Sequence, residues 1–265
     1  MKPRQHADSC SIHSSAHSVS CANLVHLRGL VRPMQFQAEP VPVQVDLSRS
    51  ALVVVDMQND FCHPRGWFSL SGTDVAYARA LIPVLRAVMT SARHQAMPVI
   101  HLHWGVRPDC LEMPLGNLRL ATRFGARTGY GETPPGGLGP ALVAGSWGGQ
   151  AIAELAPEEG DIIVHKNRFS GFWHNELDAI LRRLDISTLF FAGINTERCV
   201  LASMQDATFL GYDVLLIEDA AASPAPLAST QAAHELIRQI YGFTLCASDF
   251  IQPSGISNAP ETHGD

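Results

Sequence analysis

Short apolar runs alternate with segments of helical periodicity from residue 51 to residue 247, and this alternation constrains the fold more than any other feature. The runs predict six strands, at residues 51–55, 98–102, 161–164, 188–192, 214–217 and 243–247. Such short, fully apolar runs are typical of buried parallel strands. Repeated strand–helix units predict an α/β fold in which helices cover both faces of a mostly parallel sheet, a three-layer αβα arrangement.

Helices are predicted between these strands, at residues 74–95, 150–155, 175–184, 197–210 and 224–240. We expect Pro83 to bend or interrupt the first of them. Residues 104–147 are rich in Gly, Pro and Arg and show little periodicity, which is typical of a functional loop or lid. The domain is expected to span residues 46–252, between a disordered or extended leader at residues 1–45 and a frayed tail at residues 253–265.

Charge and composition exclude several classes of function. Charged residues make up 17% of the 265 residues, and 19 Lys and Arg stand against 25 Asp and Glu, a formal net charge of −6. A mildly acidic chain without basic blocks predicts no nucleic-acid partner. No run approaches the roughly 18 apolar residues of a membrane span. Because the leader lacks the apolar segment of a secretory signal and the six cysteines include no C-x-x-C pair, we expect a reduced, cytoplasmic protein.

Three polar side chains follow predicted strands at the edge where α/β proteins form their sites. Asp56 follows the first strand, Lys166 the third, and Cys199 comes shortly after the fourth. With Thr196 as N-cap, Cys199 lies in the first helical turn, where the helix dipole and a nearby lysine favour a thiolate of lowered pKa. An aspartate at the same edge could move protons, so the three residues could form a nucleophilic site. Each also has an ordinary explanation: a turn, a solvated surface or a packed core.

The segments around these residues resemble those of the isochorismatase-like cysteine hydrolases. They are Val-Val-Asp-Met-Gln-Asn-Asp-Phe at residues 54–61, the Lys166 segment, and Gly-Ile-Asn-Thr-Glu-Arg-Cys-Val at residues 193–200. The similarity runs from residue 49 to residue 250, and it implies a six-stranded, mostly parallel Rossmann-like sheet.

The resemblance also assigns roles to residues. It implies that Cys199 is the nucleophile, Asp56 the base and Lys166 the supporting cation. It further implies a cis peptide bond between Ile194 and Asn195, and an oxyanion hole formed by the backbone N–H groups of Asn195 and Cys199.

Within this family, the chain is most similar to the branches that hydrolyse biuret and ureidoacrylate. Residues 60–67 and 101–109 resemble the former branch, and residues 168–172 the latter. The resemblance therefore implies a cofactor-independent amidohydrolase that cleaves a C–N bond of a small linear amide or ureido compound. The reaction would pass through a thioester and release ammonia. The family also implies a homo-oligomer, a dimer or a tetramer.

Further side chains are candidates for binding the substrate. Arg107 or Arg168 could bind a substrate carboxylate through two hydrogen bonds. The aromatic candidates for the pocket are Phe61, Trp67, Trp104 and Phe172. Glu197 and Arg198 differ from the small or amide residues that many family members have before the nucleophile, which leaves the polarity of the pocket open.

A metal site is not predicted. His101 and His103 lie at i, i+2, so they share one side of a strand and could bind a metal ion. The Asp-x-His arrangement that nicotinamidases of this superfamily use for their metal is missing from the segment. Strand histidines are more often packed or hydrogen-bonded.

Other functions remain open at this point. The substrate could instead be that of a nicotinamidase, a maleamate amidase or an N-carbamoyl amidase of the same family. Vinyl-ether hydrolysis of isochorismate is a second enzymatic alternative, but it does not need a cysteine at position 199. A non-catalytic binding domain or a redox-sensing thiol belongs to a different class, and the complete set of Asp56, Lys166 and Cys199 argues against it.

Overall fold

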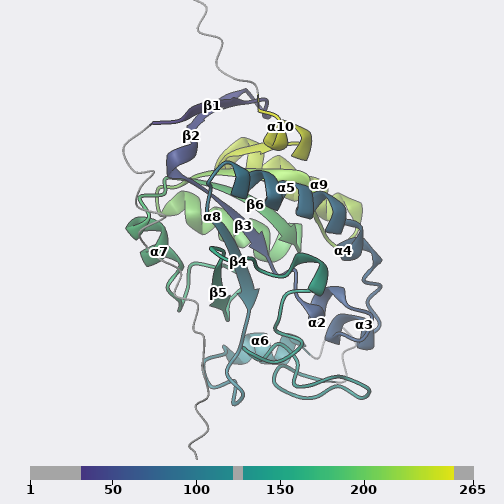
Figure 1. The fold of residues 1–265 in the computed structure, drawn as a ribbon. Helices are drawn as coiled ribbons and strands as arrows, with labels where there is room; N and C mark the ends of the chain where they lie inside the picture. Colours follow the sequence, from purple (N-terminus) through teal and green to yellow (C-terminus); the bar gives the residue numbers. More distant parts are fainter. Residues whose placement is uncertain (1–30, 122–127, 254–265) are drawn as a thin grey trace, which may run out of the picture.

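A computed structural model describes residues 31–121 and 128–253, and it places a six-stranded parallel sheet at the centre (Figure 1). The strand order is β5-β4-β3-β6-β7-β8, so the chain starts in the middle and builds outward in both directions. The strands are β3 (Ser50–Val55), β4 (Val99–Trp104), β5 (Ile162–Lys166), β6 (Thr188–Ile194), β7 (Asp213–Ala222) and β8 (Phe243–Leu245). All six match predicted strands.

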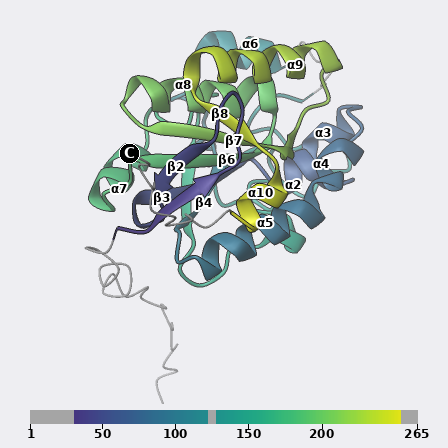
Figure 2. The ribbon, with the colours of Figure 1, turned by 90° about the horizontal axis from the view of Figure 1, so that it is seen from above.

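Helices cover both faces of the sheet, which confirms the three-layer prediction. Figure 2 shows α8 (Leu201–Phe209) and α9 (Leu227–Leu236) on one face, and α5 (Ile82–His94) and α10 (Ala247–Ile251) on the other. The central strands β3, β4 and β6 are buried along their whole length, as apolar runs covered on two sides should be. None of the helices in the described residues is long and apolar enough to cross a membrane.

Several predicted helices differ in detail from the structure. The segment 74–95 divides at Leu81 into α4 (Ala76–Ala80) and α5, because Pro83 fits the first turn of a helix but not its interior. Only a 3₁₀ turn at Ala153–Leu155 forms within residues 150–155. The remaining predicted helices are α7 (Leu177–Arg183), the π-helical turn η3 (Thr196–Val200) that runs into α8, and α9 with its π-helical end η4 (Ile237–Tyr241).

The sequence did not predict four short helices. One of them, α10, begins at Ala247, where a strand over residues 243–247 was expected; that strand, β8, ends at Leu245. The other three lie beyond the carboxyl ends of β3 and β4 (Figure 1). They are α2 (Asn59–Cys62), α3 (Trp67–Leu70) and α6 (Leu115–Ala121). The last of them lies within the expected loop 104–147.

The expected leader also contains structure. β1 (Pro33–Phe36) and β2 (Val43–Asp46) pair as an antiparallel ribbon, and a 3₁₀ turn (Leu47–Arg49) joins it to β3. Phe36 is fully buried and its ring packs against Phe190 and Phe250, so this ribbon belongs to the domain core. The remainder of the predicted leader, residues 1–30, and residues 254–265 of the predicted tail lie outside the described residues.

Candidate active site

The sheet topology brings Asp56, Lys166 and Cys199 together at one edge. Asp56 follows β3, Cys199 lies on η3 after the neighbouring strand β6, and Lys166 ends β5, two strands away. The Lys166 side chain crosses the end of β4, with Nζ 4.4 Å from the centre of the Trp104 ring. Its ammonium then lies 2.9 Å from Asp56 Oδ2. The contact with the Trp104 ring therefore helps to hold the buried Lys166 ammonium beside the Asp56 carboxylate.

Asp56 and Lys166 form a buried ion pair. Their side chains are 3% and 0% exposed, and Asp56 Oδ1 also accepts the backbone N–H of Trp104 at 2.9 Å. Burial raises the pKa of Asp56, although the charge of Lys166 opposes the rise. Burial acts to lower the pKa of Lys166, but the interactions with Asp56 and Cys199 together outweigh it, so the pKa is raised. Lys166 is thus charged, and the raised pKa of the neighbouring Asp56 carboxylate suits a general base.

The backbone around the site is specialised. Asp56 has a positive φ of 55°, and the peptide bond between Ile194 and Asn195 is cis. Gly193 has a φ of 105°, and a Cβ at this position would lie 2.2 Å from the Val55 carbonyl oxygen. Only glycine therefore lets the end of β6 approach β3 this closely. That approach brings η3 beside Asp56.

Cys199 differs from its prediction in both position and pKa. The residue that precedes η3 is Asn195 rather than Thr196, so Cys199 is the fourth residue of the helical segment. Burial raises the pKa of its thiol to about 12, and Asp56 adds to the rise while Lys166 opposes it. The prediction of a lowered pKa was wrong, because removal from water and a neighbouring carboxylate outweigh the lysine and the helix terminus. With a pKa of about 12 the resting thiol is neutral, and it interacts with both members of the ion pair.

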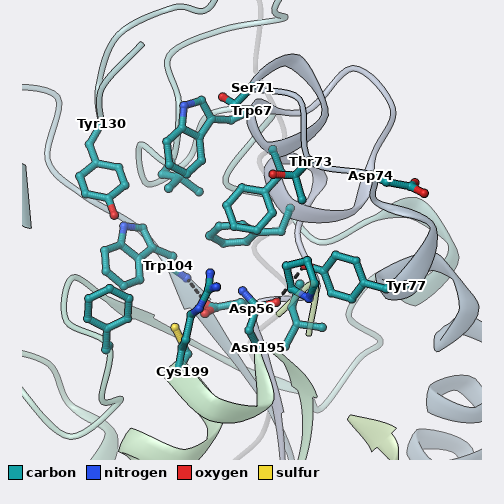
Figure 3. Close-up of a pocket in the computed structure, with 17 residues that line it drawn as sticks. Asp56, Trp67, Ser71, Thr73, Asp74, Tyr77, Trp104, Tyr130, Asn195 and Cys199 are labelled. Carbon is teal, nitrogen blue, oxygen red and sulfur yellow. Dashed lines mark hydrogen bonds between the residues drawn. The ribbon is translucent and has the colours of Figure 1, made fainter. Parts of the chain in front are cut away.

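A pocket of about 540 Å³ opens above these residues (Figure 3). Asp56 and Cys199 lie at its base, while Lys166 lies behind the lining. Seven of the seventeen lining residues are aromatic, which suits a small planar substrate. The described residues that line it are Asp56, Phe61, Trp67, Phe68, Ser71, Thr73, Asp74, Tyr77, Trp104, Tyr130, Leu142, Phe169, Ile194, Asn195, Arg198, Cys199 and Pro224.

Comparison with known families identifies this arrangement. Residues 50–249, which contain Asp56, Lys166 and Cys199, match the model of the Isochorismatase domain. The chain belongs to the isochorismatase family. Residues 33–46, which form the β1–β2 ribbon, precede the part that matches the family model.

Two ureidoacrylate amidohydrolases are similar to this chain. The ureidoacrylate amidohydrolase RutB of Caulobacter segnis is 34% identical over 214 residues, which cover 80% of this chain and 89% of that protein. The protein of the same name from Stutzerimonas stutzeri is 33% identical, over 86% of this chain and 91% of its own length.

Solved structures support the same fold. A cysteine hydrolase from Pseudomonas syringae pv. phaseolicola 1448A superposes with a TM-score of 0.65 at 23% identity, over 84% of this chain and 96% of that one. The N-carbamoylsarcosine amidase of Thermoplasma acidophilum has a TM-score of 0.58 at 26% identity, over 75% of this chain and 96% of that one.

Three of the six predicted substrate-binding residues line the pocket, namely Phe61, Trp67 and Trp104. The other three lie outside its lining. Arg107 pairs with Asp109 on an exposed loop. Arg168 donates to the carbonyl oxygens of Asn167 and Glu112. Phe172 packs against Tyr212. The chemistry of these side chains suggested them as candidates, but in the structure they contact other residues outside the pocket.

The two histidines of β4, His101 and His103, contact neighbouring side chains. His101 Nε2 lies 3.0 Å from Asp161 Oδ2, and His103 packs against the rings of His101 and His165. Burial lowers the pKa of His103 to about 3, and the other two histidines add to this effect. Within residues 31–121 and 128–253, no group of three or more His, Cys, Asp or Glu is arranged to hold a metal ion.

Sequence reasoning missed several pocket residues. Tyr130 comes from the long loop 104–147 and packs against both Trp67 and Trp104. Tyr77, on α4, donates its hydroxyl proton to Asn195 Oδ1 at 2.8 Å. Phe169 packs against the Trp104 ring. None of these aromatic residues stands at a strand end, so only the folded chain shows that they face the site.

Proposed function

We propose that this isochorismatase-family chain is a cysteine-dependent amidohydrolase. It cleaves a C–N bond of a small linear amide or ureido compound of the biuret or ureidoacrylate kind. The observation that carries the proposal is the buried Asp56–Lys166 ion pair, with its 2.9 Å contact, beside a buried thiol at the base of an aromatic pocket. The amidohydrolase names of the relatives support the same reaction class.

In the first step, Asp56 accepts the proton of the Cys199 thiol while Lys166 stabilises the negative charges. The sulfur attacks the carbonyl carbon, forms a C–S bond and moves an electron pair to the oxygen. The backbone N–H groups of Asn195 and Cys199 stabilise this oxyanion as an oxyanion hole. The raised pKa of Cys199 supports this order of events, because a neutral thiol needs a base at the moment of attack.

In the second step, the tetrahedral intermediate collapses and its C–N bond breaks. Asp56 returns the proton to the departing nitrogen, which leaves a thioester on Cys199. Asp56 then deprotonates a water molecule, which attacks the thioester and restores the thiol. Ammonia leaves directly when the departing nitrogen is an NH₂ group, or by breakdown of carbamate when that nitrogen carries the rest of the substrate. No step uses a cofactor.

There are two alternatives to this proposed function. One is a different amide within the same reaction, such as nicotinamide, maleamate or an N-carbamoyl amino acid. The structural similarity to an N-carbamoylsarcosine amidase favours the last of these. The other is a binding domain with an inert thiol. The cytoplasmic location and the homo-oligomer remain predictions.

Ammonia release across a substrate panel tests the proposal. The panel contains biuret, ureidoacrylate, nicotinamide, maleamate and N-carbamoyl amino acids. We expect turnover of at least one ureido compound by the native chain and loss of all turnover in Cys199→Ala, with the fold kept. Cys246→Ala, an exposed cysteine outside the pocket, is the matched control and should keep full activity. Turnover by Cys199→Ala equal to that of the native chain would refute the cysteine mechanism.

A further inference from the structure

A hydrogen bond in the pocket wall joins two segments that lie far apart in the chain. The Tyr77 hydroxyl, on α4, donates to Asn195 Oδ1 at 2.8 Å (Figure 3). Both residues line the pocket. The proposed mechanism uses the backbone N–H of Asn195, but it gives no role to either side chain. The bond therefore connects a residue without an assigned function to the residue that directly precedes η3.

The turn that follows Asn195 holds its peptide from one side. The Asn195 carbonyl oxygen accepts the N–H groups of Arg198 at 3.0 Å and of Val200 at 3.3 Å. The Asn195 N–H donates to no backbone carbonyl of the described residues, and Tyr77 is the one residue among them that hydrogen-bonds to the Asn195 side chain. The N–H is thus free for a ligand, and Tyr77 holds the residue from the other side.

Helix α4 gives the Tyr77 hydroxyl a fixed position. Val75 and Ala78, on either side of Tyr77 in the chain, are buried. Arg79 connects the same helix to Glu154 with a contact of 2.9 Å. Burial raises the pKa of Tyr77, so its hydroxyl keeps its proton at any pH at which the fold is expected to be stable. The donor is therefore a neutral group on an anchored element.

The direction of the Asn195 N–H matters for the chemistry. A donor of an oxyanion hole acts through its fixed orientation, and the loss of one such donor lowers kcat by about 100- to 1000-fold. A donor that is kept but less well oriented should cost less. Because the Asn195 N–H belongs to the residue whose side chain Tyr77 holds, release of that side chain allows this peptide to move.

We propose that Tyr77 is a positioning residue for the hydrolysis. Its hydroxyl holds the Asn195 side chain and thereby orients the Asn195 N–H toward the substrate oxygen at Cys199. Tyr77 thus acts on the oxyanion of the transition state more than on binding of the intact amide. This inference rests on the proposed function, because that function places the oxyanion beside Asn195.

Steady-state kinetics of Tyr77→Phe, which keeps the ring and removes the donor, test the inference. Ammonia release is measured with whichever of biuret and ureidoacrylate the native chain hydrolyses faster. We expect kcat to fall about 10-fold while KM changes less than about twofold, because orientation of the N–H matters in the transition state. Tyr212→Phe is the matched control: this hydroxyl lies outside the pocket lining and also makes a hydrogen bond of 2.8 Å, to Asp178, so its loss should leave kcat unchanged.

A double-mutant cycle with Asn195→Ala separates a positioning role from a direct contact between Tyr77 and the substrate. Asn195→Ala removes the acceptor of the bond, so on its own it should also lower kcat about 10-fold. If Tyr77 acts through Asn195, the double variant should be no slower than either single variant. Independent roles would instead multiply to a loss of about 100-fold.

Three results would overturn the inference: native kcat in Tyr77→Phe, a rise in KM at unchanged kcat, or losses that multiply in the double variant. Circular dichroism checks each fold, and if Tyr77→Phe unfolds, kcat and KM of Asn195→Ala decide by the same criteria. Each of these results leaves the proposed function in place as long as the native chain is active and Cys199→Ala is not. A native chain without any turnover would refute the proposed function and this inference with it.

Discussion

At the scale of single residues, the site combines a charged pair with a neutral thiol. Asp56 and Lys166 are both removed from water, so each depends on the other for its charge. Cys199 shares the same buried space and keeps its proton. The arrangement delays formation of the thiolate until a substrate can use it, which limits side reactions of the sulfur.

The raised pKa of Cys199 predicts a particular pH dependence of alkylation. Below its pKa a thiol has a thiolate fraction that grows about tenfold per pH unit, and thiolate is the reacting form. With a pKa of about 12, the rate of Cys199 alkylation by iodoacetamide should still rise between pH 7 and pH 10. Peptide mass spectrometry measures the rate at Cys199 alone. A plateau below pH 8 would contradict the account.

Removing one member of the ion pair predicts losses of both stability and activity. Lys166→Met leaves the Asp56 carboxylate buried without its cation, which should lower the free energy of unfolding by about 3 to 5 kcal/mol. We expect kcat/KM to fall at least about 100-fold.

The double variant Asp56→Asn/Lys166→Met is the control for that prediction. It removes both charges, so denaturant unfolding should show most of the stability regained while kcat/KM stays at least about 100-fold below that of the native chain. If the single Lys166→Met variant were as stable and as active as the native chain, the ion pair would have no role in either property.

Sequence reasoning located Asp56, Lys166 and Cys199 because their places depend on strand ends, which local apolar patterns reveal. It could not foresee the position of Tyr130, because Tyr130 stands in the long segment 104–147, whose sequence has no periodicity to read. The thiol pKa was misjudged for a related reason, since burial is a property of the packed fold.

At the scale of elements, a cluster of charged side chains formed by Arg93, His101 and Asp161 connects α5, β4 and the start of β5 on the side of the sheet away from the pocket. Arg93 of α5 contacts Asp161 Oδ2 at 2.6 Å, just before β5, and His101 of β4 contacts the same oxygen at 3.0 Å. Burial alone would raise the pKa of Asp161, but the hydrogen bonds from His101 and Arg93 lower it to about 2. This cluster therefore connects α5 to the edge strand β5, whose last residue is Lys166.

This lowered pKa predicts how stability depends on pH. Asp161→Asn should lower the free energy of unfolding by about 2 kcal/mol at pH 7. A carboxyl with a lowered pKa stabilises the fold above its unfolded pKa of 3.8 and loses that effect as pH falls through about 2. The difference between variant and native chain in urea unfolding should therefore shrink between pH 5 and pH 2. Glu158→Gln, whose exposed carboxylate also contacts Arg93, should change stability little.

The elements that the sequence predicted and those it missed differ in what stabilises them. Buried strands such as β3 and β6 carry their own apolar signal over five or more residues. The β1–β2 ribbon has no such apolar run, because Phe36 is its one fully buried residue. The ring of Phe36 packs against Phe190 and Phe250, which lie far along the chain. Contacts of that kind between distant segments leave no local pattern.

At the scale of the whole molecule, the family resemblance predicts a homo-oligomer. In the helix predicted at residues 224–240, Leu227 is 71% exposed and Ile240 is 61% exposed. Large apolar side chains on a surface favour association. Light scattering on the purified chain should give a mass at least twice 28.7 kDa. A monomer at micromolar concentration would contradict this expectation.

The most direct test of the central claim is to trap the acyl-enzyme. The native chain is mixed with a ureido substrate that it turns over, quenched in acid within milliseconds, and digested for mass spectrometry. The account predicts that the peptide containing Cys199 gains the mass of the acyl portion of the substrate, and that the adduct disappears once substrate is exhausted. Turnover with no adduct on Cys199 at any time, or an adduct on another cysteine, would contradict it.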